Sequence, residues 1–164
     1  MMKLRIYIDT SVIGGCLDKE FQNASMELID KFKRGEMIVV ISELTTLELK
    51  DAPQEVQNIL KEIPERKIEC VELTEEAVNL AGKYITEGVI GRGKLVDAEH
   101  IAIATINRVD VLVSWTLGCT PDNTAYTLWA NALALRDIAP FGRNVVYAGN
   151  AIGNCESSEE NSKI

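Results

Sequence analysis

The chain has 164 residues, of which 46% are hydrophobic, and its formal net charge is -8. A chain of this length forms one ordinary domain, and its apolar residues suffice for a core that needs neither disulfides nor a structural metal. The negative charge argues against a protein that coats nucleic-acid backbone, because such a protein needs a basic surface. It leaves a nuclease open, since a metal ion brings positive charge to an acidic site.

Targeting signals and metal-binding cysteine pairs are missing from the sequence. No apolar run reaches the roughly 18 residues of a membrane-spanning helix, and no apolar signal-peptide region follows Met1. We therefore expect a cytoplasmic protein without a membrane partner. The four cysteines lie far apart, at Cys16, Cys70, Cys119 and Cys155. With His100 as the single histidine, this spacing does not match a zinc site, and we expect reduced thiols.

Strand-like and helix-like segments alternate along the first two thirds of the chain. Apolar runs predict strands over residues 3–8, 37–41, 67–73 and 110–115. Helical spacing and capping residues predict helices over residues 22–34, 42–53, 54–62, 75–87 and 95–107. Gly14 and Gly15, shortly after the first strand, predict a turn. The order predicts an α/β protein with three layers, α/β/α, and a central parallel sheet of four to five strands.

The last third of the sequence has weaker patterns. Residues 123–137 have helical spacing, and residues 144–147 resemble a short strand that would be the fifth. We expect residues 1–150 to form one domain. Residues 151–164 are rich in glutamate and serine, which predicts a disordered acidic tail.

Three carboxylates are placed by these elements at one edge of the expected sheet. Asp9 directly follows the first strand, Glu48 lies about two turns into the helix after the second strand, and Asp97 lies in the first turn of the helix before the fourth strand. Ligands bind beyond the carboxyl ends of the strands in such sheets. The helix dipole at its N-terminus would help Asp97 to stay ionised beside other acids.

Carboxylates that lie so close together need a compensating cation. Each pair at about 4 Å repels by roughly 1 to 4 kcal/mol, depending on the local dielectric. Mg²⁺ or Mn²⁺ prefers carboxylate oxygens and keeps positions for water and phosphate. Such an ion can activate water and stabilise charge on a phosphate, so the pattern favours hydrolysis of phosphodiester bonds.

Three motifs resemble those of PIN-domain nucleases. Residues 6–11, IYIDTS, are similar to the first acidic motif of this family, Ser42 with Glu48 six residues later to the second, and residues 95–104, LVDAEHIAIA, to the third. Their order and spacing match as well, and the resemblance covers about residues 3–115. It implies a metal-dependent ribonuclease of the type found as the toxin of toxin–antitoxin pairs. Such proteins act on RNA as homodimers and are inhibited by a small antitoxin.

The resemblance also assigns roles to individual residues. It implies that Asp9, Glu48 and Asp97 are the catalytic residues and the ligands of Mg²⁺ or Mn²⁺. Thr10 and Ser11 correspond to hydroxyl positions of the family, which contact the metal's water or the substrate phosphate.

The fourth motif of the family departs from its usual form. PIN domains commonly have a Ser or Thr, one further residue and then an acid or amide after the fourth strand, whereas Ser114 and Trp115 are followed here by Thr116. A hydroxyl is a poorer metal ligand, so Thr116 is expected to contact substrate. The sequence from residue 117 onward does not resemble the family. An altered reading frame or an exchanged C-terminus would produce this pattern, and comparison of the coding DNA in all frames tests it.

Each candidate residue also has a purely structural interpretation. Asp9 at a strand end could cap a turn, and Glu48 could be a solvated helix residue. His100 is more readily a hydrogen-bonded core histidine than a general base. Trp115 is expected in the core or at a dimer interface. Arg92 and Lys94 could meet RNA phosphate or be solvated.

Two other functions remain open. A PIN-like domain that has lost turnover would bind protein or RNA, and Thr116 favours this alternative. A different carboxylate-metal phosphohydrolase would need Asp-x-Asp after the first strand for an aspartyl-phosphate mechanism, whereas Ser11 occupies the second of these positions.

Overall fold

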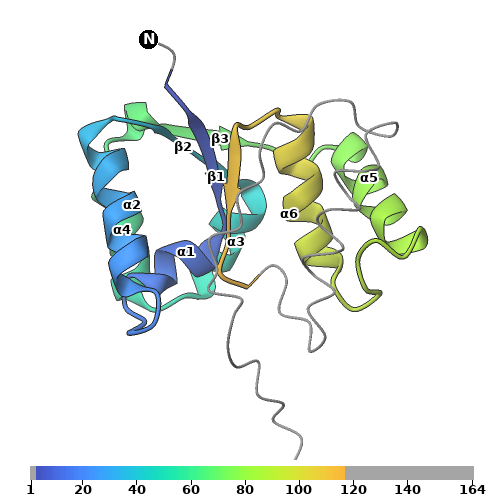
Figure 1. Ribbon diagram of the computed structural model, residues 1–164, viewed down its shortest axis with the longest axis horizontal. Coiled ribbons are helices and arrows are strands. Elements are labelled where there is room, and N and C mark those ends of the chain that lie inside the picture. Colours follow the sequence, from blue (N-terminus) through green and yellow to red (C-terminus); the bar gives the residue numbers. More distant parts are fainter. Residues whose placement is uncertain (1–2, 117–164) are drawn as a thin grey trace, which may run out of the picture.

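The computed structural model describes residues 3–116, which form a parallel sheet with helices on both faces (Figure 1). The strands are β1 (Arg5–Ile8), β2 (Ile38–Ser42), β3 (Ile68–Val71) and β4 (Val111–Val113), in the spatial order β3-β2-β1-β4. All three pairings are parallel, and Ile8 lies opposite Val113 in the β1–β4 pair. The predicted α/β class with a parallel sheet is therefore confirmed.

Six α-helices and one 3-10 helix connect the four strands in the described part of the chain. They are α1 (Thr10–Gly15), α2 (Gln22–Arg34), α3 (Glu43–Asp51), α4 (Gln54–Lys61), η1 (Glu65–Lys67), α5 (Glu75–Thr86) and α6 (Leu95–Ile106). Three helix ends have capping residues: Gly35 ends α2 with a φ of 73°, and the Ser42 and Thr74 hydroxyls accept hydrogen bonds from backbone amides of α3 and α5.

Alternating side chains of the strands build one core on each face of the sheet. Tyr7 of β1 packs in a cluster with residues of α5 and α6, whereas Ile6 and Ile8 pack in the opposite cluster with residues of α1, α2 and α4. Figure 1 shows these two helical layers on either side of the strands, with α2 and α4 on one side and α5 and α6 on the other. Burial on both faces explains why the strands are almost continuously apolar in sequence.

One local prediction was wrong. The segment after β1 was expected to be a turn because of Gly14 and Gly15, but it forms α1. The Asp9 side chain caps this helix, and Val12 and Ile13 are fully buried in the core, so packing outweighs the low helix propensity of glycine. The strand predicted over 67–73 is also shorter than expected, since η1 occupies its first residue.

Several predictions concern residues outside the described range. These are the helix over 123–137, the fifth strand over 144–147 and the acidic tail over 151–164. Of the cysteines, Cys16 is buried and Cys70 is exposed, and both are free thiols as expected. None of the helices within residues 3–116 has the length and apolar character needed to span a membrane.

Gly15 occupies a position that has no room for a side chain. A Cβ atom there would lie 2.4 Å from Ser25 Oγ and 2.7 Å from Trp115 Nε1, whereas a Cβ atom on Gly14 would meet nothing within 4 Å. We therefore expect Gly15→Ala to lower the free energy of unfolding by roughly 1 to 3 kcal/mol. Gly14→Ala is the matched control and should be neutral or slightly stabilising in this helix. Urea denaturation of both variants checks this, and equal midpoints would contradict the close packing described here.

Candidate active site

Asp9 lies at the carboxyl end of β1, where it is buried and accepts three hydrogen bonds. Its side chain is 4% exposed and caps α1. One oxygen, Oδ1, accepts from the amide of Ser11 at 3.1 Å and from the Ser11 hydroxyl at 2.5 Å. The other, Oδ2, accepts from the Ser114 hydroxyl at 2.5 Å. These contacts fix the carboxylate at the boundary between β1 and β4.

The end of β4 reaches Asp9 through two serine hydroxyls. Ser11 Oγ accepts from the amide of Trp115 at 2.9 Å, and Ser114 Oγ accepts from the amide of Thr116 at 3.2 Å. Both hydroxyls donate to Asp9 at the same time. Ser114, the hydroxyl residue of the fourth motif, therefore contacts the acidic centre directly, and the role of Thr116 in contacting substrate stays a prediction. Trp115 is 7% exposed and stacks on Phe21, so the core interpretation of this residue is confirmed.

Glu48 lies on α3 and faces α1 and α6. Its Oε2 accepts from the Thr10 hydroxyl at 2.5 Å, and its Oε1 lies 3.5 Å from His100 Nε2. The nearby His100 ring and the Thr10 hydroxyl lower the pKa of Glu48, against the opposing effect of partial burial. Glu48 therefore stays ionised. It is held by Thr10 and His100, and so is not the freely solvated helix residue of the alternative interpretation.

Asp97 lies in the first turn of α6, where its side chain is 26% exposed. Burial raises the pKa of Asp97, Asp9 raises it further, and Lys94 and His100 oppose this shift. Lys94 Nζ lies 3.7 Å from Asp97 Oδ2. The helix dipole was expected to keep Asp97 ionised. Loss of water around this half-buried carboxylate has the larger effect on its pKa. The ionised form of Asp97 is thus less stabilised than that of Glu48, whose pKa is lowered.

The three candidate carboxylates share one edge of the sheet. Asp9 follows β1, Glu48 contacts the residue after Asp9, and Asp97 interacts electrostatically with Asp9. His100 lies one turn after Asp97 on the same face of α6 and contacts Glu48. Strand order reverses between β1 and β4, which is where open α/β sheets bind ligands.

The donor atoms at this edge are of the type that a hard divalent cation prefers. They are carboxylate oxygens of Asp9, Glu48 and Asp97 and hydroxyl oxygens of neighbouring residues. As the side chains stand, however, no three His, Cys, Asp or Glu residues within 3–116 have the spacing of a metal site. The Asp97 side chain is 26% exposed and has room to change torsion angle around an ion, whereas Glu48 is held by Thr10 and His100.

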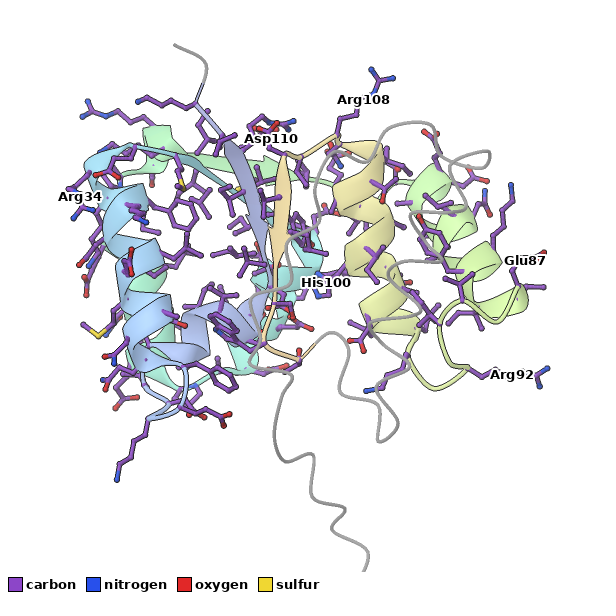
Figure 2. All side chains as sticks on the ribbon, viewed as in Figure 1. Arg34, Glu87, Arg92, His100, Arg108 and Asp110 are labelled. Carbon is purple, nitrogen blue, oxygen red and sulfur yellow. The ribbon has the colours of Figure 1, made fainter. Side chains whose placement is uncertain are left out.

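Sequence analysis did not identify two contributors to the site. Ser114 donates to Asp9, and the Tyr7 hydroxyl lies within hydrogen-bond distance of Ser42 Oγ and of His100 Nδ1, at 2.7 Å from each. The position of Ser114 could have been derived from the end of a strand next to β1. The role of Tyr7 could not, because the alternation of the strand places it simply in the core. Figure 2 shows His100 projecting from α6 toward the strands.

Comparison with known proteins identifies the fold. No family model and no curated protein sequence matches the chain. The structure is similar to the VapC20 toxin of Mycobacterium tuberculosis, described as cleaving the sarcin–ricin loop, with a TM-score of 0.50 and 13% identity over 74% of this chain and 94% of that one. It is also similar to VapBC2 of Rickettsia felis bound to a promoter DNA fragment, with a TM-score of 0.45 and 15% identity over 89% and 98% of the two chains.

At such low identity the likeness to VapC20 establishes the architecture and leaves the chemistry to the site itself. The motifs in residues 3–115 led us to expect a parallel sheet between two helical layers. The strand order and the two cores of the structure have this arrangement. The resemblance to PIN-domain toxins is therefore confirmed for the fold, and the chain has the PIN-like fold of the VapC20 toxin.

Proposed function

We propose that this chain is a ribonuclease that hydrolyses RNA phosphodiester bonds with a Mg²⁺ or Mn²⁺ ion held by Asp9, Glu48 and Asp97. The observation that supports the proposal is the placement of Asp9 after β1, of Glu48 on α3 in contact with Thr10, and of Asp97 in the first turn of α6, where it interacts electrostatically with Asp9. Burial makes the ionised Asp97 costly to the fold despite its ion pair with Lys94, and a bound cation would offset this cost. When bound, such an ion supplies Lewis acidity and positive charge for phosphodiester hydrolysis.

The protein's own groups would orient the reacting phosphate. Asp9 is fixed by three hydrogen bonds and cannot swing away from the edge. The hydroxyls of Thr10 and Ser11 lie in the first turn of α1 beside the acids, where they donate to Glu48 and Asp9, and each would contact a phosphate oxygen by redirecting this hydrogen bond. Thr116 is exposed at the end of β4 and is the remaining substrate-contacting candidate.

RNA as the substrate is supported by the fold. VapC20 is described as a toxin that cleaves the sarcin–ricin loop, and this chain shares its architecture. We extend the same inference to a cytoplasmic toxin that acts as a homodimer and is bound by a small antitoxin. The acidic charge of -8 agrees with a metal-assisted enzyme better than with a protein that binds RNA by a basic surface.

The experiment is cleavage of a labelled RNA by the purified full-length chain. We expect cleavage with Mn²⁺ or Mg²⁺ and none after chelation with EDTA, with activity restored by added Mn²⁺. Cleavage that is unaffected by EDTA would contradict the role of the ion.

One observation favours the alternative of a PIN-like module that binds without cleaving. The side chains of residues 3–116 do not form a ready-made three-ligand metal site. Calorimetric titration with Mn²⁺ separates the two functions. Binding below millimolar concentration supports the ribonuclease, whereas no binding supports the module.

A further inference from the structure

His100 is a residue of α6 whose side chain is buried, and each of its ring nitrogens has a polar neighbour. Its side chain is 3% exposed, Nδ1 lies 2.7 Å from the Tyr7 hydroxyl, and Nε2 lies 3.5 Å from Glu48 Oε1. The ring also meets Tyr7 edge-on, with centroids 5.9 Å apart. A histidine held on both sides cannot turn without breaking one of these contacts.

Tyr7 gives this ring a rigid support. It is fully buried in β1, and burial raises the pKa of its hydroxyl, so the group stays neutral and carries a proton. The hydroxyl lies within hydrogen-bond distance of Ser42 Oγ, at 2.7 Å, and Ser42 in turn caps α3 by accepting from the amide of Thr45. Tyr7 of β1 therefore contacts His100 directly, and Ser42, the residue before α3, supports Tyr7.

Glu48 lies on α3, the helix that Ser42 caps, and it is the most exposed residue in this series of contacts. Its side chain is 39% exposed, and a glutamate has three rotatable bonds, so it needs neighbours to keep one conformation. The contacts that the structure provides are the Thr10 hydroxyl on Oε2 and His100 Nε2 on Oε1. One neighbour therefore holds each oxygen, and His100 is the one anchored in the core.

We propose that His100 is a positioning residue that keeps the Glu48 carboxylate turned toward the candidate metal site, and that Tyr7 and Ser42 hold the His100 ring for this task. The inference rests on the proposed function, because it assigns Glu48 as a ligand. Partners behind metal ligands typically change metal affinity by about ten- to a hundredfold. His100 itself touches neither ion nor substrate in this arrangement.

Two substitutions separate the contacts of the ring. His100→Gln places an amide nitrogen near the position of Nε2, and so keeps a donor for Glu48. His100→Asn places its amide near the position of Nδ1, and so keeps a partner for Tyr7 while it loses the one for Glu48. Both variants remove the same aromatic ring from the same buried position, so a merely structural histidine would respond similarly to both.

We expect His100→Asn to weaken Mn²⁺ binding in calorimetry by about tenfold or more, and His100→Gln to restore affinity to within about threefold of the parent. The Tm of the two metal-free variants should fall by similar amounts. Equal Mn²⁺ affinities of the two variants would overturn the proposal, as would a larger loss in the Gln variant.

Crystal structures of the metal-free parent and variants give a readout that does not depend on the proposed function. We expect Glu48 to keep its conformation in His100→Gln and to move or occupy several conformations in His100→Asn. An unmoved Glu48 in both variants overturns the positioning role. A parent that binds no Mn²⁺ refutes the proposed function instead, and the conformation of Glu48 still decides the role of His100.

Discussion

Asp9→Asn should slow RNA cleavage by about a hundred- to a thousandfold without unfolding the protein. A carboxylate that holds the ion is worth about 3 to 4 kcal/mol of transition-state stabilisation if the ion's charge is used fully, and each 1.4 kcal/mol is a factor of ten. The asparagine keeps an oxygen for the amide and hydroxyl of Ser11, and its NH₂ group can donate to the Ser114 hydroxyl after that hydroxyl turns. The rate constant of cleavage under saturating Mn²⁺ is the measurement.

The control for this variant is Asp51→Asn. It makes the same chemical change on an exposed residue at the end of α3. We expect it to cleave RNA at the parental rate, which separates the loss of a ligand from the loss of one negative charge. An Asp9→Asn protein that folds and cleaves as fast as its parent would show that Asp9 only caps α1.

Asp97→Asn should stabilise the metal-free protein and abolish its stabilisation by Mn²⁺. Burial and Asp9 raise the pKa of Asp97 in the folded state above its value of about 3.9 in an unfolded chain. The folded state therefore binds the Asp97 proton more tightly than the unfolded state does. The stability gained from this proton is fully present at pH values below the unfolded pKa. It is lost as the pH rises through the raised pKa, so at pH 7 the ionised Asp97 is a net cost.

Removing this charge relieves the cost of burial and loses the ion pair with Lys94, so we expect a small net gain, at roughly 2 to 4 °C in Tm per kcal/mol for a protein of this size. Thermal unfolding at pH 7 with EDTA should place Asp97→Asn above the parent, and the difference should shrink at acidic pH. At a Mn²⁺ concentration about a hundred times its Kd, the parent should gain roughly 2.7 kcal/mol and the variant little.

Asp51→Asn again serves as the control and should respond to Mn²⁺ as the parent does. A metal-free Asp97→Asn protein that melts below its parent would mean that the ion pair with Lys94 outweighs the cost of burial. Equal stabilisation of parent and variant by Mn²⁺ would remove Asp97 from the set of ligands.

Much of the fold was predictable because local and global signals agree in this chain. The strands are apolar on both faces, as buried parallel strands must be, and Ser42, Thr74 and Gly35 mark helix ends with side-chain or backbone geometry that acts over a few residues. The short helix α1 was missed because its stability comes from burial of Val12 and Ile13 in the tertiary structure. Gly14 and Gly15, which follow them, favour a turn in the sequence pattern.

The edge of the sheet was predictable, whereas its hydrogen-bond network was not. Strand ends and helix starts place Asp9 and Asp97 on one side of the sheet from sequence alone. The contact of Ser114 with Asp9 depends on the β1–β4 register and joins residues 105 apart. The contact of Tyr7 with His100 joins residues 93 apart and depends on how α6 packs on the sheet.

The most direct test of the shared cation is a crystal structure of the full chain grown with Mn²⁺ and measured at the manganese absorption edge. We expect one anomalous peak bound by carboxylate oxygens of Asp9, Glu48 and Asp97 at about 2.0 to 2.2 Å, the distances typical of a small divalent ion. A protein that shows no peak at this edge, or a peak that these three side chains do not touch, would contradict it.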